Sequence, residues 1–213
     1  MMENSKWNNH YTNDKSILSY PDENLVRLIK KNYTEQTAQK LFALDLGCGT
    51  GRHIKLLGEC GFKNIAGTDS SINALTHSGK HSGYMINCDN RSLPLKTNSI
   101  DLIIAWGSLH YNNKTDLSVM LDEIKFILKT NGLFFATLRS SRDTHLKRGE
   151  DKGNNEWITD LNDISGSSAS FYTEEELKNE FSIFSQVEYG IIERSLMGDI
   201  SKIISHWVIS ARK

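Results

Sequence analysis

The chain has 213 residues, of which 25 are lysine or arginine and 26 are acidic, so its formal net charge is −1. This length is ample for a hydrophobic core, and we expect a single domain over residues 1–213. Because the basic residues are scattered and do not outnumber the acidic ones, the composition argues against nucleic acid as the default partner.

Residues 1–20 are polar. They contain neither a charged-then-apolar signal pattern nor an apolar segment of about 20 residues that could cross a membrane. We therefore expect a cytoplasmic protein that has no membrane partner. Cys48, Cys60 and Cys88 form no C-x-x-C pair and are odd in number, which predicts free thiols in or near the core. No metal-ligand spacing is present among the cysteines and histidines, so we expect no metal site.

Helix and strand patterns alternate through the first half of the chain. Apolar positions at helical spacing and short apolar runs follow one another, and each strand is followed by an acid or a glycine-rich turn. The expected elements are a helix over residues 22–32, a strand over 41–45, a helix that Gly61 ends, a strand over 63–68, a helix capped by Ser70 or Ser71 and a strand over 84–88.

The second half continues the alternation and then breaks it. Residues 100–106 are a nearly continuous apolar run, typical of a central parallel strand. Residues 139–170 are polar and lack periodicity, so we expect a long loop that is functional or disordered. The remaining expected elements are a helix that includes Leu117 to Leu128 and ends at Asn131-Gly132, a strand over 133–138, a helix opened by a capping box at Thr173, and two β-like runs over 184–192 and 203–211.

Strands that alternate with helices predict an α/β fold, a Rossmann-like doubly wound sheet with helices on both faces. In such a sheet, ligands bind beyond the carboxyl ends of the strands. Four polar or glycine-rich segments fall at those ends: residues 45–51, Asp69, residues 89–90 and residues 106–110.

The glycine-rich segment indicates the class of cofactor. A dinucleotide loop of the form G-x-G-x-x-G needs a glycine where this chain has Arg52, which argues against nicotinamide or flavin. The run Asp45-Leu46-Gly47-Cys48-Gly49-Thr50-Gly51 resembles the first motif of the class I S-adenosylmethionine-dependent methyltransferases. The resemblance implies a seven-stranded, mostly parallel sheet whose last strand is antiparallel. It divides the chain into an N-terminal lid and helix (1–33), a cofactor-binding core (38–139), a substrate-side insertion (140–170) and a C-terminal hairpin region (171–213).

Further residues are expected to hold this cofactor. Asp69 follows the glycine loop by about 20 residues, the spacing at which a carboxylate can accept both hydroxyls of a ribose; its alternative role is to cap a helix. The resemblance assigns Asp89 to the adenine amino group, and it likens Trp7 and Tyr11 to a W-x-x-x-Y lid. The expected cofactor-binding residues are Tyr11, Asp45, Gly47, Cys48, Gly49, Gly51, Asp69, Ser70, Asp89, Asn90 and Trp106.

The methyl acceptor is expected beside residues 106–111 and the insertion. His110 can act as a base because the pKa of imidazole lies near ~6.5, although a structural histidine is the alternative. A guanidinium of the insertion can hold an acidic acceptor, whereas a solvated charge run is the usual meaning of such a cluster. The expected catalytic residues are His110 and His145, and the expected substrate-binding residues are Tyr111, Arg139, Arg142 and Trp157.

These residues predict methyl transfer to an oxygen or nitrogen of a small-molecule acceptor, which can be anionic, by a monomer or homodimer. Sulfur or tellurium is a further possible acceptor atom. An RNA or protein acceptor is one alternative, but Ala105-Trp106-Gly107-Ser108 stands where amino-methylating enzymes have Asn-Pro-Pro-Tyr or Asp-Pro-Pro-Tyr. The other alternative is a catalytically silent, methyltransferase-like binding subunit that uses the cofactor or the fold only as a scaffold.

Overall fold

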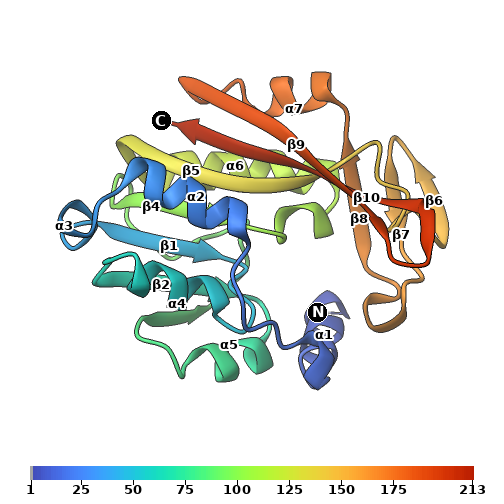
Figure 1. Ribbon diagram of the computed structural model, residues 1–213, viewed down its shortest axis with the longest axis horizontal. Coiled ribbons are helices and arrows are strands. Elements are labelled where there is room, and N and C mark those ends of the chain that lie inside the picture. Colours follow the sequence, from blue (N-terminus) through green and yellow to red (C-terminus); the bar gives the residue numbers. More distant parts are fainter. Residues whose placement is uncertain (1) are drawn as a thin grey trace.

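One hydrogen-bonded sheet organises the computed structural model, which describes residues 2–213 (Figure 1). Its central strands run parallel in the order β3-β2-β1-β4-β5, and β10 follows antiparallel between β5 and β9. The strands are β1 (Phe42–Leu46), β2 (Asn64–Asp69), β3 (Tyr84–Asn87), β4 (Ile100–Ala105), β5 (Leu128–Ser140), β6 (Glu150–Gly153), β7 (Glu156–Ile158), β8 (Ser168–Tyr172), β9 (Gln186–Leu196) and β10 (Asp199–Arg212).

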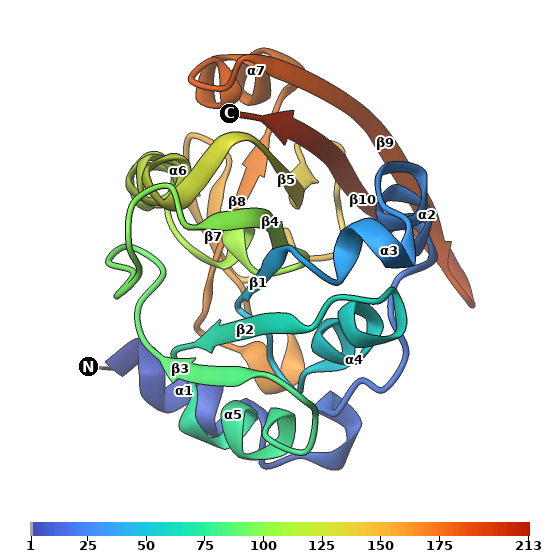
Figure 2. The same ribbon diagram turned by 90° about the vertical axis from the view of Figure 1, so that its left-hand side faces the viewer.

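Helices cover both faces of this sheet, as predicted (Figure 2). One apolar core lies under α2, α3, α4 and α5, and the other lies under α6 and α7. The helices are α1 (Met2–His10), α2 (Glu23–Asn32), α3 (Glu35–Ala38), α4 (Arg52–Glu59), α5 (Ile72–Ser78), α6 (Lys114–Ile127) and α7 (Glu174–Phe181), with short 3-10 turns η1 (Asp14–Ser16), η2 (Leu109–Tyr111) and η3 (Asn162–Ile164).

The sheet has ten strands, more than the seven expected. The additional strands β6, β7 and β8 lie within and just after the polar stretch that was expected to be an irregular loop. β8 pairs with the end of β5 at Arg139 and Ser140, and β7 and β6 extend the sheet from there. The sequence gives little sign of β6 because its four residues are exposed and polar, so no apolar alternation marks the strand.

The prediction that Asn131-Gly132 ends a helix is wrong. Helix α6 ends at Ile127, and Leu128 is already extended and pairs with Ile100 of β4. Leu128 is fully buried in the same core as the apolar residues of α6, so it continues their helical spacing without being helical. Asn131, with φ of +65°, lies in an irregular part of β5.

Helix α1 lies across the carboxyl edge of the sheet, on the side toward which β1 points (Figure 1). The side-chain carbonyl of Asn8 accepts a hydrogen bond from Ser71 Oγ (2.9 Å), and its backbone carbonyl accepts one from Asn73 Nδ2 (3.0 Å). On the other side, Lys6 Nζ donates to the Gly166 carbonyl. These contacts hold α1 between α5 and the segment that precedes β8.

Three further observations concern the described residues. Cys48, Cys60 and Cys88 are free thiols, and the first two are buried, in agreement with the prediction. Within residues 2–213, no three His, Cys, Asp or Glu side chains are grouped so that they could hold a metal ion. In the same range, no helix has the length and apolar character needed to cross a membrane.

Candidate functional site

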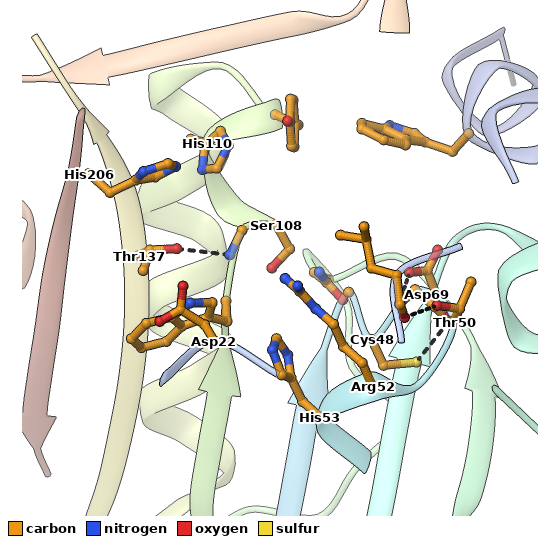
Figure 3. Close-up of a pocket in the computed structure, with 18 of the residues that line it drawn as sticks. Asp22, Cys48, Thr50, Arg52, His53, Asp69, Ser108, His110, Thr137 and His206 are labelled. Carbon is orange, nitrogen blue, oxygen red and sulfur yellow. Dashed lines mark hydrogen bonds between the residues drawn. The ribbon is translucent and has the colours of Figure 1, made fainter. Parts of the chain in front are cut away.

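A cavity of about 860 Å³ opens at the carboxyl edge of the sheet, where the strand order reverses between β1 and β4. Its lining comes from the loop after β1, from the ends of β2 and β4, from α1, and from β5, β9 and β10. The volume falls within the range of about 300 to 1,000 Å³ that small-molecule sites occupy. Figure 3 shows the two ends of the cavity: Cys48, Thr50 and Asp69 at one, and His110, Thr137 and His206 at the other.

The glycine loop forms the first end and admits no larger residue. Gly47 and Gly49 both have positive φ, +67° and +53°. A Cβ atom on Gly47 would lie 2.5 Å from Ser108 Cβ, and one on Gly49 would lie 2.7 Å from the Tyr11 hydroxyl. Both residues line the cavity, so a ligand can approach the loop backbone closely. Gly51, with φ of +84°, is instead the N-cap of α4 and lies outside the lining.

Asp69 holds this loop in place. One carboxylate oxygen accepts a hydrogen bond from the Gly49 amide (2.9 Å), and the other accepts one from the Ser71 amide (2.8 Å) at the start of α5. Burial raises the pKa of Asp69, while these two amides act in the opposite direction. Asp69 therefore has the capping role considered as its alternative. It also lines the cavity, and its carboxylate oxygens can accept further hydrogen bonds.

The ends of β3 and β4 supply the adjacent lining. Asp89 accepts two hydrogen bonds from Arg91 Nε (2.9 and 3.1 Å), and Arg91 lowers the pKa of that carboxyl. The side-chain carbonyl of Asn90 accepts a hydrogen bond from Thr68 Oγ1 (3.1 Å). Ser108 Oγ donates to the Leu46 carbonyl (2.8 Å), which ties the end of β4 to the end of β1. The expected cofactor residues in this part of the lining are Cys48, Ser70, Asp89, Asn90 and Trp106.

Asp45 lies below the loop and outside the cavity lining. Its side chain is buried, and Oδ2 lies 3.9 Å from His53 Nδ1, a distance too long for a hydrogen bond. Burial raises the pKa of Asp45 to about 7, although Arg52 opposes the shift. Burial and Arg52 lower the pKa of His53 to about 3. The placement of Asp45 therefore supports a role beneath the loop and not the direct cofactor contact that the motif suggested.

Aromatic side chains close the cavity from α1 and the residue that follows it. Tyr11 lies against Gly49, and burial raises the pKa of its hydroxyl. The ring of Trp7 contacts the ring of Tyr111 edge-on, with centroids 4.9 Å apart. Both of these N-terminal aromatic residues line the cavity. The expected lid segment is thus in contact with both the glycine loop and η2.

The opposite end of the cavity is one face of the sheet. On β10, His206 pairs directly with Arg139 of β5 and with Ile192 of β9, and Ile204 pairs with Arg194. Directly paired residues point to the same face, as do residues two apart in a strand, so these side chains form one surface. We name this surface the far wall and define it by residues Thr137, Arg139, Ile192, Arg194, Ile204 and His206, with His110 of η2 beside them.

His110 is buried next to this face. Its ring centroid lies 5.8 Å from that of His206. Neither ring nitrogen of His110 makes a hydrogen bond of ordinary geometry within the described residues. Burial, Arg139 and His206 lower the pKa of His110 well below its ordinary value, and the backbone of Thr137 acts in the opposite direction. The imidazole is therefore neutral at pH 7, with one N–H to donate and one lone pair to accept.

The structure does not bring the other expected acceptor residues to the cavity. Arg142, His145 and Trp157 lie outside its lining, whereas Arg139 and Tyr111 belong to it. Arg142 is exposed and pairs with Glu193, and Trp157 packs beside β8. The hairpin β6–β7 carries Trp157 alongside β8. Arg142 lies in the turn after β5, and the amide of His145 donates to the Ile203 carbonyl of β10 (3.1 Å).

Several lining residues were not expected from the sequence. His53 directly follows the glycine loop, in the first turn of α4. On β5, the face that carries Leu133 and Phe135 in the core changes to Thr137 and Arg139 at the cavity. In the sequence, this change from apolar to polar residues at alternate positions could have indicated the far wall. The residues missed are Arg52, His53, Thr137, Arg194 and His206.

Residues 44–136 match the protein family described as methyltransferase domain. This segment contains the glycine loop, Asp69, Asp89 and Trp106, which together form one end of the cavity. This part of the chain is therefore similar to a methyltransferase domain. The glycine cradle and Asp69 fit S-adenosylmethionine, the cofactor that the glycine-loop motif predicts.

Curated relatives match this chain over less than half of its length. A human protein named arginine-hydroxylase NDUFAF5, mitochondrial, is 35% identical over 98 residues, which are 45% of this chain and 28% of that protein. The uncharacterized protein MJ1252 of Methanocaldococcus jannaschii is 33% identical over 104 residues, 48% of this chain and 38% of that protein. This chain thus spans well under half the length of both relatives.

Solved structures resemble this chain over most of its length. A S-adenosylmethionine-dependent methyltransferase of Methanosarcina mazei has a TM-score of 0.71 at 17% identity and covers 87% of this chain and 96% of its own. Magnesium protoporphyrin IX methyltransferase of Synechocystis PCC 6803, solved with bound S-adenosylmethionine, has a TM-score of 0.63 at 14% identity, with 90% and 77% covered. The predicted fold class is confirmed.

Proposed function

We propose that this protein transfers the methyl group of S-adenosylmethionine to an oxygen or nitrogen of a small-molecule acceptor. The observation that carries the proposal is a continuous cavity of about 860 Å³ with the glycine loop at one end and the far wall at the other. Its volume suits a cofactor and a small acceptor side by side. Contacts of Trp7 and Tyr11 partly cover it, which favours a small acceptor over an RNA or protein chain.

The residues at the glycine-loop end would bind and orient the cofactor. Gly47 and Gly49 let its polar groups approach the loop backbone, and Asp69 offers acceptor oxygens for ribose hydroxyls. Asp89 and Asn90 line the same end of the cavity, and we assign them to the adenine. Tyr11 would cover the loop and exclude water.

When bound, S-adenosylmethionine supplies a methyl group on a sulfonium whose leaving group is a neutral thioether. The protein therefore needs mainly to align the acceptor and keep water out. Trp106 and Tyr111 would form the aromatic walls of the cavity between the cofactor and the acceptor. The neutral ring of His110 can take a proton from a hydroxyl or amine at its free nitrogen, but its lowered pKa makes it a weak base.

The name of the human relative suggests a different reaction, hydroxylation at arginine. A guanidinium acceptor in this cavity would lie beside Arg139 and Arg194, and like charges repel one another. The charges of the far wall therefore favour methyl transfer to another type of acceptor.

The first test is binding of S-adenosylmethionine and S-adenosylhomocysteine to the purified chain, measured by calorimetry. Asp69→Asn leaves one oxygen where two amides now donate, so we expect its affinity to fall at least about 10-fold through the loss of a charge-assisted hydrogen bond. The control is Asp122→Asn, an equal change at an exposed position of α6, which should leave affinity unchanged. Absence of cofactor binding by the unaltered chain would refute the proposal.

The second test identifies the acceptor class. The chain is incubated with a cell extract and methyl-labelled S-adenosylmethionine, and the label is separated into ultrafiltrate, protein and RNA. Label in the ultrafiltrate supports a small acceptor. Label in protein or RNA assigns the reaction to those acceptors instead, and cofactor binding without any transfer would indicate a catalytically silent subunit.

A further inference from the structure

The far wall carries more positive charge than its own acid can neutralise. Asp143 is fully buried and pairs with Arg139, and its oxygens also accept hydrogen bonds from the amides of Leu146 (3.0 Å) and Ser205 (2.9 Å). The ion pair of Asp143 on this wall is therefore with Arg139. Among the side chains that the structure describes, no carboxylate forms an ion pair with Arg194, which lies at the exposed side of the wall.

The positive charges of Arg139 and Arg194 act on the pKa of His206. Burial is the main cause that lowers its pKa to about 4, and Arg139 and Arg194 lower it further. Asp143 and Asp22, the N-cap of α2, act in the opposite direction and do not cancel the shift. Because burial disfavours a charge of either sign, only the part of the shift that comes from Arg139 and Arg194 shows a potential that favours an anion.

Hydrogen-bond donors on the wall also lack acceptors. Arg139 is 7% exposed and His110 is 1% exposed, yet Arg139 Nε and both ring nitrogens of His110 have no partner within the described residues. A buried polar group without a partner destabilises the folded protein. A ligand that accepts hydrogen bonds from Arg139 and from the N–H of His110 would recover that energy. Guanidinium groups favour carboxylate and phosphate oxygens, to which they donate in pairs.

We propose that the far wall binds an anionic group of the methyl acceptor, a carboxylate or a phosphate, through Arg139, Arg194 and the N–H groups of His110 and His206. The acceptor is thus a small organic acid, anchored by its negative charge at the end of the cavity opposite the glycine loop. This inference rests on the proposed function, because the same cavity receives the cofactor at its other end. It gives His110 and His206 a role in substrate recognition in their neutral state.

The experiment titrates the full chain, saturated with S-adenosylhomocysteine, with benzoate, phenyl phosphate and the neutral analogue benzamide in a calorimeter. We expect the better of the two anions to bind at least about 10-fold more tightly than benzamide, a difference of about 1.4 kcal/mol. Tighter binding of benzoate identifies a carboxylate site, and tighter binding of phenyl phosphate identifies a phosphate site.

Two variants locate the site. Arg194→Gln should weaken binding of the preferred anion at least about 5-fold, because it removes a charged donor. Arg148→Gln removes the same charge at an exposed position that pairs with Asp160 outside the cavity lining, and it should leave the affinity unchanged. Thermal unfolding of both variants checks that they remain folded.

Equal affinity for benzamide and the anions would overturn the proposal, as would equal binding by the Arg194 and Arg148 variants or no binding of any probe. Affinity for S-adenosylhomocysteine is measured separately, and the anion titration is repeated without it. Failure of cofactor binding with intact anion binding would therefore refute the proposed function and leave the anion site standing.

Discussion

The two ends of the cavity are built in different ways. At the glycine loop, the backbone itself forms the surface, and its shape depends on positive φ angles and on contacts too close for a Cβ atom. At the far wall, side chains project from a regular sheet face, where the extended backbone does not require glycine. The first end is therefore intolerant of substitution, whereas the second can change its ligand by exchanging side chains on an unchanged backbone.

The largest expected effect is a loss of cofactor affinity at the glycine-loop end of the cavity. Gly47→Ala places a Cβ 2.5 Å from Ser108 Cβ at a φ of +67°, and the hydrogen bond from Ser108 to Leu46 resists displacement. We expect affinity for S-adenosylhomocysteine to fall at least about 100-fold, or about 2.7 kcal/mol, by calorimetry. Gly190→Ala on β9, where a Cβ would meet nothing within 4 Å, is the control and should bind normally. An unaltered affinity in Gly47→Ala would disprove the close approach.

The second prediction concerns pH and the pair beneath the loop. Between about pH 4 and 6.5, folded Asp45 with its pKa near 7 holds a proton that the unfolded chain has lost, so its contribution to stability falls as pH rises. Folded His53, with its pKa near 3, lacks a proton that the unfolded chain holds, so its contribution rises over the same window. In the unaltered protein the two slopes oppose each other.

Asp45→Asn removes the contribution to stability that falls as pH rises. The free energy of unfolding, measured by denaturant titration, should then rise with pH more steeply than in the unaltered protein, by up to about 1.4 kcal/mol per pH unit. His53→Gln should change the slope in the opposite direction. Parallel pH profiles for all three proteins would show that neither group has the shifted pKa.

The smallest expected effect concerns stability at the far wall. His110→Phe removes two buried ring nitrogens that have no partner within the described residues and keeps an aromatic ring of similar size. We expect thermal unfolding to show an unchanged or increased stability, by up to about 1 kcal/mol, together with weaker binding of the preferred anion. A clear loss of stability would mean that these nitrogens are satisfied in the folded protein.

This contrast explains what the sequence could predict. The glycine loop and Asp69 were identified because their geometry depends on residues close together in the chain, and the acid follows at a fixed spacing. The far wall joins Arg139 to Arg194 and His206 across three strands, and only the strand register makes them neighbours. Arg142 and His145 lie close to Arg139 in sequence but follow the turn after β5, so proximity along the chain was misleading there.

The fold was predictable for a related reason. Apolar runs that alternate with amphipathic helices mark β1 to β5 clearly, and the capping box at Thr173 was found with both of its hydrogen bonds. The hairpin β6–β7 was missed because it is short, polar and exposed, and its strands depend on pairing with β8 more than on their own residues.

The end of β5 pairs on both sides, since Arg139 lies opposite His206 of β10 and opposite Phe171 of β8. Residues 141–167 therefore leave the sheet at β5 and return beside the same strand. Their length can vary at little entropic cost without shifting the register that aligns Arg139 with His206. Related proteins can therefore differ in residues 141–167, and so in the surroundings of the cavity mouth, while the far wall keeps its arrangement.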